Sequence, residues 1–153
     1  MTLRNQLFSY IKEKYDTDPE YPWMRYPDYA VFRHAENQKW FGIVMDVSQR
    51  KLGLSGDETV DVLNVKLSDP FLVDILIKKP RYFRGYHIRR GNWVSILLDG
   101  SVPFEDVCGW LDESYLTTAS KEKSRSFARR RNGSCRRIRR TMTWKPRLRK
   151  RRK

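Results

Sequence analysis

The sequence predicts an α+β domain, a two-layer sandwich built on an antiparallel sheet, followed by a basic C-terminal tail. The predicted element order is α-β-β-β-α-β-β-α, and helices on one face of such a sheet form two layers. Adjacent strands are joined by short turns, which favours antiparallel pairing. The apolar periodicity stops after Ser120. We therefore expect one domain over residues 1–120 and a disordered tail over residues 121–153.

The chain begins with a predicted helix over residues 3–15. Leu7 and Ile11 recur at helical spacing, and Thr2 is suited to cap the first turn. Three prolines then interrupt any regular element and predict an extended connector over residues 16–28. Three aromatic residues are expected to lay this connector over an edge of the core: Tyr21, Trp23 and Tyr26.

Five strands are predicted from runs of alternating or continuous apolar residues. The apolar phase of the third strand slips between Val62 and Leu63, which predicts a bulge or burial on both faces. The five strands are expected over residues 29–35, 39–47, 59–67, 82–88 and 92–98.

A second helix is predicted between the third and fourth strands. Asp69 is a natural N-cap, Pro70 suits the first helical position, and Lys78 and Lys79 suit the negative end of the helix dipole. The inward-facing side chains are expected to be Leu72, Ile75 and Leu76. A final helix is expected over residues 103–119.

The positive charge of the chain is concentrated in the tail. The 153 residues contain 32 Lys and Arg and 18 Asp and Glu, a net charge of +14. Seventeen of the bases and one of the acids follow Ser120, so residues 1–120 hold 15 bases and 17 acids. The body is therefore faintly acidic, and the tail is expected to bind any polyanion without selecting a sequence. The alternatives for the tail are a solvated, incidental extension and a segment appended by a shifted reading frame.

The body has its own basic stretch, because no acid occurs over residues 75–98. Aromatic side chains are interleaved with its bases, and cations that contact phosphates beside rings that stack on bases are typical of nucleic-acid surfaces. Arg89 and Arg90 are expected at a hairpin tip, and Arg50 and Lys51 lie in an earlier loop that could form a second wing. The other bases of the predicted site are Lys78, Lys79, Arg81 and Arg84. The alternative is a solvated face without a ligand.

No catalytic or metal-binding pattern accompanies this surface, so we expect a protein that is not an enzyme and has no metal or cofactor. The two histidines, His34 and His87, do not fall at metal-ligand spacing with Cys or carboxylates. Cys108 and Cys135 do not form a disulfide pattern, which favours a reducing, cytoplasmic setting. The sequence contains neither a membrane-spanning apolar run nor a signal peptide.

Three stretches between Tyr21 and Thr118 resemble the MmcQ/YjbR family, small bacterial proteins usually described as DNA-binding. They are "YPDYAVFRHAENQKWFGIVMDVSQRKLGLSGDETVDVLNVKL", "RGYHIRRGNWVSILLDGSVP" and "LDESY". The resemblance implies a fold like that of secretion chaperones, with two β-hairpin wings. The residues that carry the family motif are Tyr86, His87, Trp93, Asp99 and Gly100. Arg90 and Asn92 replace the Lys and second His usual in that motif.

The expected function is nucleic-acid binding, to DNA or RNA, through the basic hairpin wing and the non-specific tail. The alternative is a protein-interaction or chaperone-like module, acting on a protein partner or as a homodimer, in which the tail is incidental. Fold resemblance alone does not decide between them.

Overall fold

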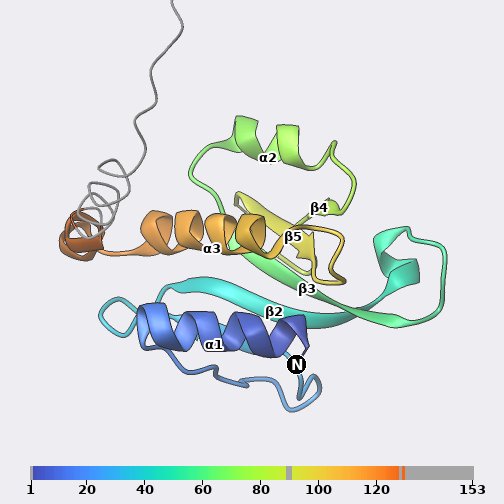
Figure 1. Cartoon of the computed structure of the whole chain (residues 1–153), viewed down its shortest axis with the longest axis horizontal. Helices are drawn as coiled ribbons and strands as arrows, with labels where there is room; N and C mark the ends of the chain where they lie inside the picture. Colours follow the sequence, from blue (N-terminus) through green and yellow to red (C-terminus); the bar gives the residue numbers. More distant parts are fainter. Residues whose placement is uncertain (1, 89–90, 128, 130–153) are drawn as a thin grey trace, which may run out of the picture. The chain divides into compact units, whose positions relative to one another are not determined.

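The computed structural model describes residues 2–88, 91–127 and 129 of the chain. The chain divides into two compact units, Met1–Ala119 and Ser120–Lys153. The first unit has the predicted α+β architecture, which is confirmed (Figure 1). Its elements are α1 (Leu3–Tyr15), β1 (Ala30–Arg33), β2 (Trp40–Ser48), the 3₁₀ helix η1 (Gln49–Leu52), β3 (Thr59–Lys66), α2 (Pro70–Leu76), β4 (Tyr82–Arg84), β5 (Trp93–Leu97) and α3 (Phe104–Thr118).

The five strands form one antiparallel sheet in the order β1-β2-β3-β5-β4. The α1 and α3 helices lie over one face of it (Figure 1). A β-bulge occurs between β1 and β2: Phe32 pairs with Gly42 and Arg33 with Trp40, so Phe41 is the extra residue. The bulge predicted in β3 is absent from its ladders, where Val62 and Leu63 are both buried on opposite faces, as the alternative prediction held.

Capping decides where two helices begin. The Thr2 side chain accepts a hydrogen bond from the Asn5 amide, as predicted. The Asp69 carboxylate accepts one of 2.9 Å from the Phe71 amide, and Pro70 occupies the first turn of α2. The prediction for the rest of α2 was wrong in two respects. The helix ends at Leu76, before Lys78 and Lys79, and its buried residues include Val73 rather than Ile75.

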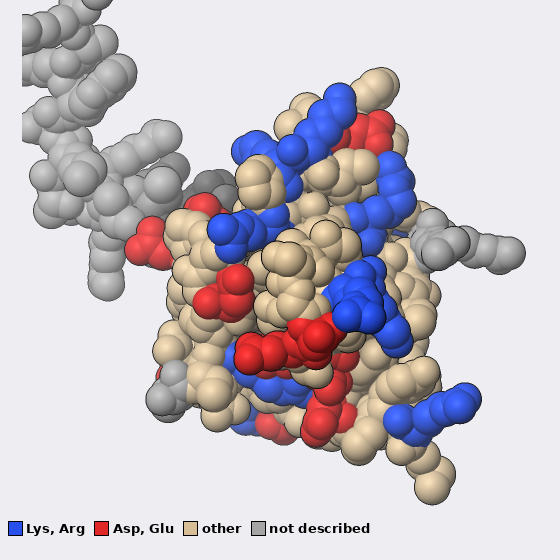
Figure 2. Space-filling model, turned by 90° about the vertical axis from the view of Figure 1, so that its right-hand side faces the viewer, with Lys and Arg blue, Asp and Glu red and all other residues tan. Residues whose placement is uncertain are grey.

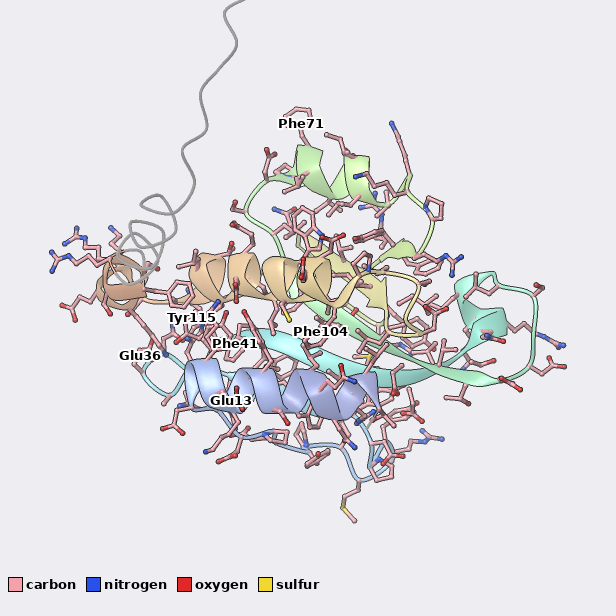
Figure 3. The ribbon with its side chains drawn as sticks, viewed as in Figure 1. Glu13, Glu36, Phe41, Phe71, Phe104 and Tyr115 are labelled. Carbon is pink, nitrogen blue, oxygen red and sulfur yellow. The ribbon has the colours of Figure 1, made fainter. Side chains whose placement is uncertain are left out.

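The face of the sheet under α1 and α3 is packed with large aromatic side chains. The Phe41 ring lies 5.0 Å from that of Tyr115, and the two point toward one another between β2 and α3 (Figure 3). The Ser114 hydroxyl donates to the Phe41 carbonyl at 2.6 Å and accepts from the Lys66 amide at 2.8 Å. These bonds tie α3 to the bulged strand and to the end of β3.

The opposite face, which we call the open face, carries no helix of the α1–α3 layer but is also apolar. Alternate residues of the strands point to it, and loops and the short η1 helix pack on them. Its buried cluster is Tyr29, Val31, Ile43, Met45, Val47, Val62, Trp93 and Leu97. The partly buried residues packed on it come from the connector, from η1 and the loop after it, from the β4–β5 connection and from the strands β2, β3 and β4: Trp23, Trp40, Leu52, Leu54, Val60, Phe83, Tyr86 and Ile88.

The described part of the second unit is helical after Ser120, whereas the sequence predicted disorder there. Residues 121–127 are helical, and the Ser124 amide donates to the Ser120 carbonyl at 2.9 Å. The Ser120 hydroxyl accepts from the Lys123 amide at 3.3 Å, so this serine caps the turn. Residue 128 and residues 130–153 lie outside the described part of the chain.

Candidate nucleic-acid interface

The predicted basic residues that the structure describes are exposed, and several pair with acids that the sequence places outside the basic stretch. Figure 2 shows the side on which Lys and Arg gather, with Asp and Glu among them. Three exposed ion pairs join predicted bases to acids: Arg50 to Asp57 at 2.6 Å, Arg81 to Asp99 at 3.5 Å, and Arg84 to Asp74 at 3.4 Å. Such pairs contribute little to stability, so a phosphate can replace the carboxylate at low cost.

Two of the predicted bases from distant parts of the sequence meet at one hollow. Lys51 of η1 and Arg84 of β4 line a hollow of about 480 Å³, which we call the basic hollow. Its other described lining residues are Gly85, Tyr86 and His87. Lys78 and Lys79 are exposed beyond the end of α2 and do not line it, whereas Arg89 and Arg90 lie outside the described residues.

A second hollow, of about 460 Å³, adjoins the first on the open face, and we call it the aromatic pocket. It is lined by Trp23, Tyr26, Tyr29, Trp40, Ile43, Met45, His87 and Ile88. The Trp23 ring meets that of Trp40 edge-on at 5.7 Å, and the Tyr26 ring stacks on that of Tyr29 at 4.6 Å. Because His87 lines both hollows, the cationic and aromatic sites are contiguous.

Residues 85–88 form the wall between the two hollows, and their backbone is held by specific contacts. The prediction that this segment continues the fourth strand was wrong, because β4 ends at Arg84. A Cβ on Gly85 would lie 2.7 Å from the Trp93 Cβ and 2.8 Å from the Ile88 carbonyl oxygen, so only glycine allows this approach. His87 has φ +60°, a left-handed conformation that is uncommon for a residue with a side chain.

The rest of the family motif has structural roles. Trp93 is buried on β5, and its backbone carbonyl accepts a 3.0 Å hydrogen bond from the Gly85 amide. Asp99 shapes the turn after β5 by accepting from the Ser101 amide at 2.9 Å. Burial raises the pKa of Asp99, but the bonds from Ser101 and the charge of Arg81 outweigh it and lower the pKa overall. Gly100 has φ +91° in the same turn.

The aromatic pocket presents a neutral phenol. Burial, with smaller contributions from Tyr86 and Asp46, raises the pKa of Tyr29 to about 12. The ring therefore stays uncharged at neutral pH and offers an apolar wall with a hydroxyl at its edge.

The pocket-lining aromatics Trp23, Tyr26, Tyr29 and Trp40 were missed as site residues by sequence reasoning. Trp23 packs on the core as predicted, and Tyr26, although 40 % exposed, stacks on the buried Tyr29, whereas Tyr21 is 51 % exposed. The available signal was the density of aromatics in a proline-broken connector, since such residues on a loop favour a binding surface.

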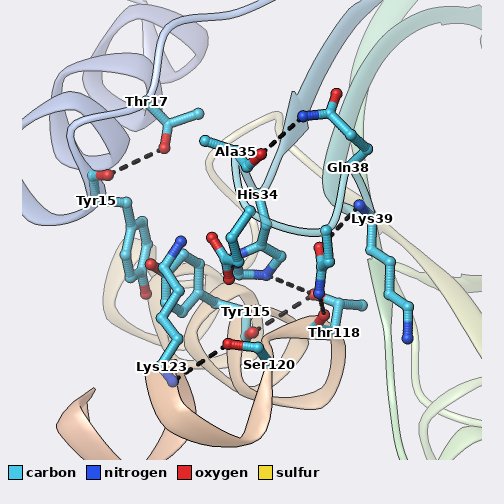
Figure 4. Close-up of polar contacts among 12 residues, drawn as sticks. Tyr15, Thr17, His34, Ala35, Gln38, Lys39, Tyr115, Thr118, Ser120 and Lys123 are labelled. Carbon is cyan, nitrogen blue, oxygen red and sulfur yellow. Dashed lines mark hydrogen bonds and ion pairs between the residues drawn. The ribbon is translucent and has the colours of Figure 1, made fainter.

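The other histidine belongs to the opposite face of the sheet. His34 is buried, and its Nε2 lies 2.9 Å from the Thr118 hydroxyl (Figure 4). That hydroxyl donates to the Ser114 carbonyl at 2.8 Å. Its ring packs 4.4 Å from that of Tyr115. This histidine ties the β1–β2 turn to α3.

Across residues 2–88, 91–127 and 129, no group of three or more His, Cys, Asp and Glu could hold a metal ion. Cys108 is buried, and burial raises the pKa of its thiol to about 11. Within the same residues, no helix is sufficiently long and apolar to cross a membrane.

Comparison with known proteins places this geometry in a family. The family model described as YjbR matches residues 12–117. YyaQ, an uncharacterized protein of Bacillus subtilis (strain 168), is 39% identical over 118 residues, covering 77% of this chain and 99% of YyaQ.

Two solved structures are similar to this chain in fold. A crystal structure of a Pseudomonas syringae protein is 40% identical, with a TM-score of 0.72, and the match covers 76% of this chain and 98% of that one. A crystal structure from Deinococcus radiodurans shares the fold at 23% identity and a TM-score of 0.59, covering 80% of this chain and 82% of that one.

Proposed function

Because this chain belongs to the YjbR family, with the α+β fold of that family, we propose that its domain binds nucleic acid on the open face of the sheet. The β2–β3 loop and the β4–β5 hairpin act as two wings that contact the phosphate backbone. The domain works as a cytoplasmic binding module without catalysis, and the tail adds sequence-blind affinity.

The observation that carries this proposal is the meeting of Lys51 and Arg84 at one hollow beside an aromatic pocket. These bases are 33 positions apart in a body whose overall charge is slightly negative. Two cations that meet on a domain of slightly negative net charge support a local anion-binding site rather than non-specific attraction to polyanions. Lys78 and Lys79 extend the positive surface beyond α2, and Arg89 and Arg90 add charge to the β4–β5 connection.

The test separates the domain from the tail. The Pseudomonas syringae relative consists almost wholly of the matched domain and folds, so residues 1–120 are a reasonable chain to prepare. Duplex DNA, single-stranded DNA and heparin are titrated against this chain and the full chain at several salt concentrations. The proposal expects the short chain to bind a nucleic acid in preference to heparin, with a measurable salt slope.

Charge reversal then locates the site. The double variant Lys51→Glu, Arg84→Glu should reduce affinity and lower the salt slope by about 2, because two phosphate contacts are lost. The matched control is Lys12→Glu, Lys39→Glu, which changes the net charge equally at exposed positions outside both hollows. Equal losses in the two variants, or binding only by the full chain, would count against the domain as the binding element.

A second candidate function is protein interaction, which a different surface favours. Phe71 and Ile75 are 76% and 56% exposed one turn apart on α2, and Phe71 points away from the fold (Figure 3). Apolar side chains at this spacing are suited to a protein partner or a second copy of the domain. Sedimentation of wild type and Phe71→Glu tests it, since self-association through α2 should be lost in the variant.

A further inference from the structure

We propose that the aromatic pocket receives one unstacked nucleobase of a single strand, while the phosphate joined to it lies in the basic hollow. This inference rests on the proposed function and adds the unit that is recognised. It also assigns the roles: Tyr26 and the indoles supply the stacking surface, and Lys51 and Arg84 supply the cations.

The chemistry of the lining favours a flat, aromatic ligand. Trp23, Tyr26, Tyr29 and Trp40 contribute four rings, and Ile43 and Met45 form the apolar floor from β2. A volume of about 460 Å³ lies in the range of small-ligand pockets. Stacking on aromatic side chains is how proteins hold bases that have left a helix, and it works for every base because each has a π-face.

The two hollows match the two ends of a nucleotide. Any nucleotide joins an aromatic base to an anionic phosphate through one sugar, and among the described residues His87 lines both sites. Charge complementarity therefore favours a nucleotide, because every residue of a nucleic acid carries a phosphate next to an aromatic base, whereas a peptide places an anion beside an aromatic side chain only in particular sequences. Arg84 can turn from Asp74 to a phosphate, since both side chains of that ion pair are 60% exposed.

The dividing wall is held in place before any ligand arrives. The Tyr86 backbone amide donates to the Ser95 hydroxyl at 2.9 Å, and that hydroxyl donates to the side-chain Oδ1 of the buried Asn64. The Tyr86 and His87 rings pack at 4.0 Å. A fixed wall keeps the distance between the two sites constant, which lowers the entropy cost of binding both ends together.

The experiment compares an oligonucleotide that has bases with one that lacks them. The full chain is titrated with a 12-nucleotide single strand of DNA carrying 2-aminopurine at its centre, and with the same strand made abasic at the central positions. The tail meets the same phosphates in both, so its contribution cancels. We expect quenching of the 2-aminopurine emission on binding and weaker binding of the abasic strand. Emission that stays unchanged in the bound complex would overturn the inference.

Two tyrosines of the same connector give a matched pair of variants. Tyr26→Ala should weaken binding of the base-containing strand by roughly 5- to 150-fold, the range of one lost stacking interaction, and leave the abasic strand unaffected. Tyr21→Ala, at an exposed position that does not line the pocket, should change neither. Tyr26→Phe should restore the binding, because the ring and not the hydroxyl supplies the stacking. Unchanged binding of the abasic strand by Tyr26→Ala shows that the variant is still folded.

Failure of this inference is distinguishable from failure of the proposed function. If Lys51→Glu, Arg84→Glu weakens both strands equally and Tyr26→Ala weakens neither, the domain binds phosphate but the pocket takes no base. If both sets of variants bind like wild type, the proposed function fails as well. A short acidic peptide with one tryptophan and a mononucleotide are also compared as competitors of the 2-aminopurine strand. If the peptide displaces the strand at lower concentration, the pocket belongs to a protein partner instead.

Discussion

The backbone amide of Tyr86 donates a 2.9 Å hydrogen bond to the hydroxyl of Ser95, one strand away on β5. That hydroxyl is buried and donates in turn to Asn64 on β3, whose amide group lies 3.4 Å from the Met45 sulfur on β2. A polar chain therefore crosses three strands of the open face and ends at the wall between the two hollows.

Ser95→Ala should lower the free energy of unfolding by about 1–3 kcal/mol, because the side-chain Oδ1 of Asn64 and the backbone amide of Tyr86 lose the hydroxyl that both bind. Urea denaturation measures the change. The control is Ser55→Ala, at an exposed position of the β2–β3 loop, which should fall within ~0.5 kcal/mol of wild type. Equal stability of the two variants would show that the buried chain does not hold the wall.

Gly85→Ala should destabilise the domain by about 1–3 kcal/mol, because the new Cβ must displace Trp93 or the Ile88 carbonyl. Gly109→Ala is the matched control. It lies in α3 with no atom within 4 Å of the added Cβ, so it should stabilise the domain by up to about 1 kcal/mol. Thermal unfolding of both variants checks the opposite signs.

The left-handed backbone of His87 predicts which substitutions the wall accepts. His87→Asn should keep the stability of wild type, because asparagine tolerates this conformation. His87→Val should lose about 1–2 kcal/mol, since a β-branched residue is strained there. Chemical denaturation distinguishes them, and similar values for both would mean that the segment relaxes out of the left-handed region.

The buried thiol of Cys108 predicts a pH dependence. Its pKa is raised to about 11 by burial, while the ordinary pKa of an exposed thiol, as in the unfolded chain, is 9.0. Between pH 9 and pH 11 the thiol of the unfolded chain has lost its proton and that of the native chain keeps it. The stability that the native state has through its protonated thiol is therefore fully present below pH 9 and is lost as the pH rises toward 11. The free energy of unfolding of a Cys135→Ser chain should therefore fall across this range.

Alkylation of the same chain gives an independent reading of the thiol. Iodoacetamide should react with Cys108 far more slowly in the native state than in urea at pH 9, because the thiolate is the reactive form and burial suppresses it. Comparable rates would show that α3 opens readily or that the thiol is not buried.

Much of the fold could be predicted because it depends on local signals. Helical spacing and the Thr2 cap predicted the bounds of α1 that the structure has, and Asp69 with Pro70 predicted the start of α2. The inward face of α2 could not be predicted, because Val73 is buried by the packing of the helix near β4 and β5, and the spacing of apolar residues had favoured Ile75 instead.

The candidate site likewise has residues that the sequence predicted and residues that only the structure showed. Its bases could be selected from the sequence by charge, and Lys51, Arg84, Tyr86 and His87 were among the residues predicted to matter. Sequence reasoning paired Arg50 with Lys51, but only Lys51 lines the hollow. Nothing in the linear pattern showed that the connector aromatics would lie beside them.

The sequence by itself determined the element order, the antiparallel sheet and the separation of a faintly acidic body from a basic tail, because periodicity, caps and charge counts are local quantities. Only the tertiary structure decided that Trp23 and Trp40 share a pocket with His87. The physical reason is that pairing of strands distant in sequence, with a left-handed turn at His87 and no side chain at Gly85, sets which loops meet on the open face.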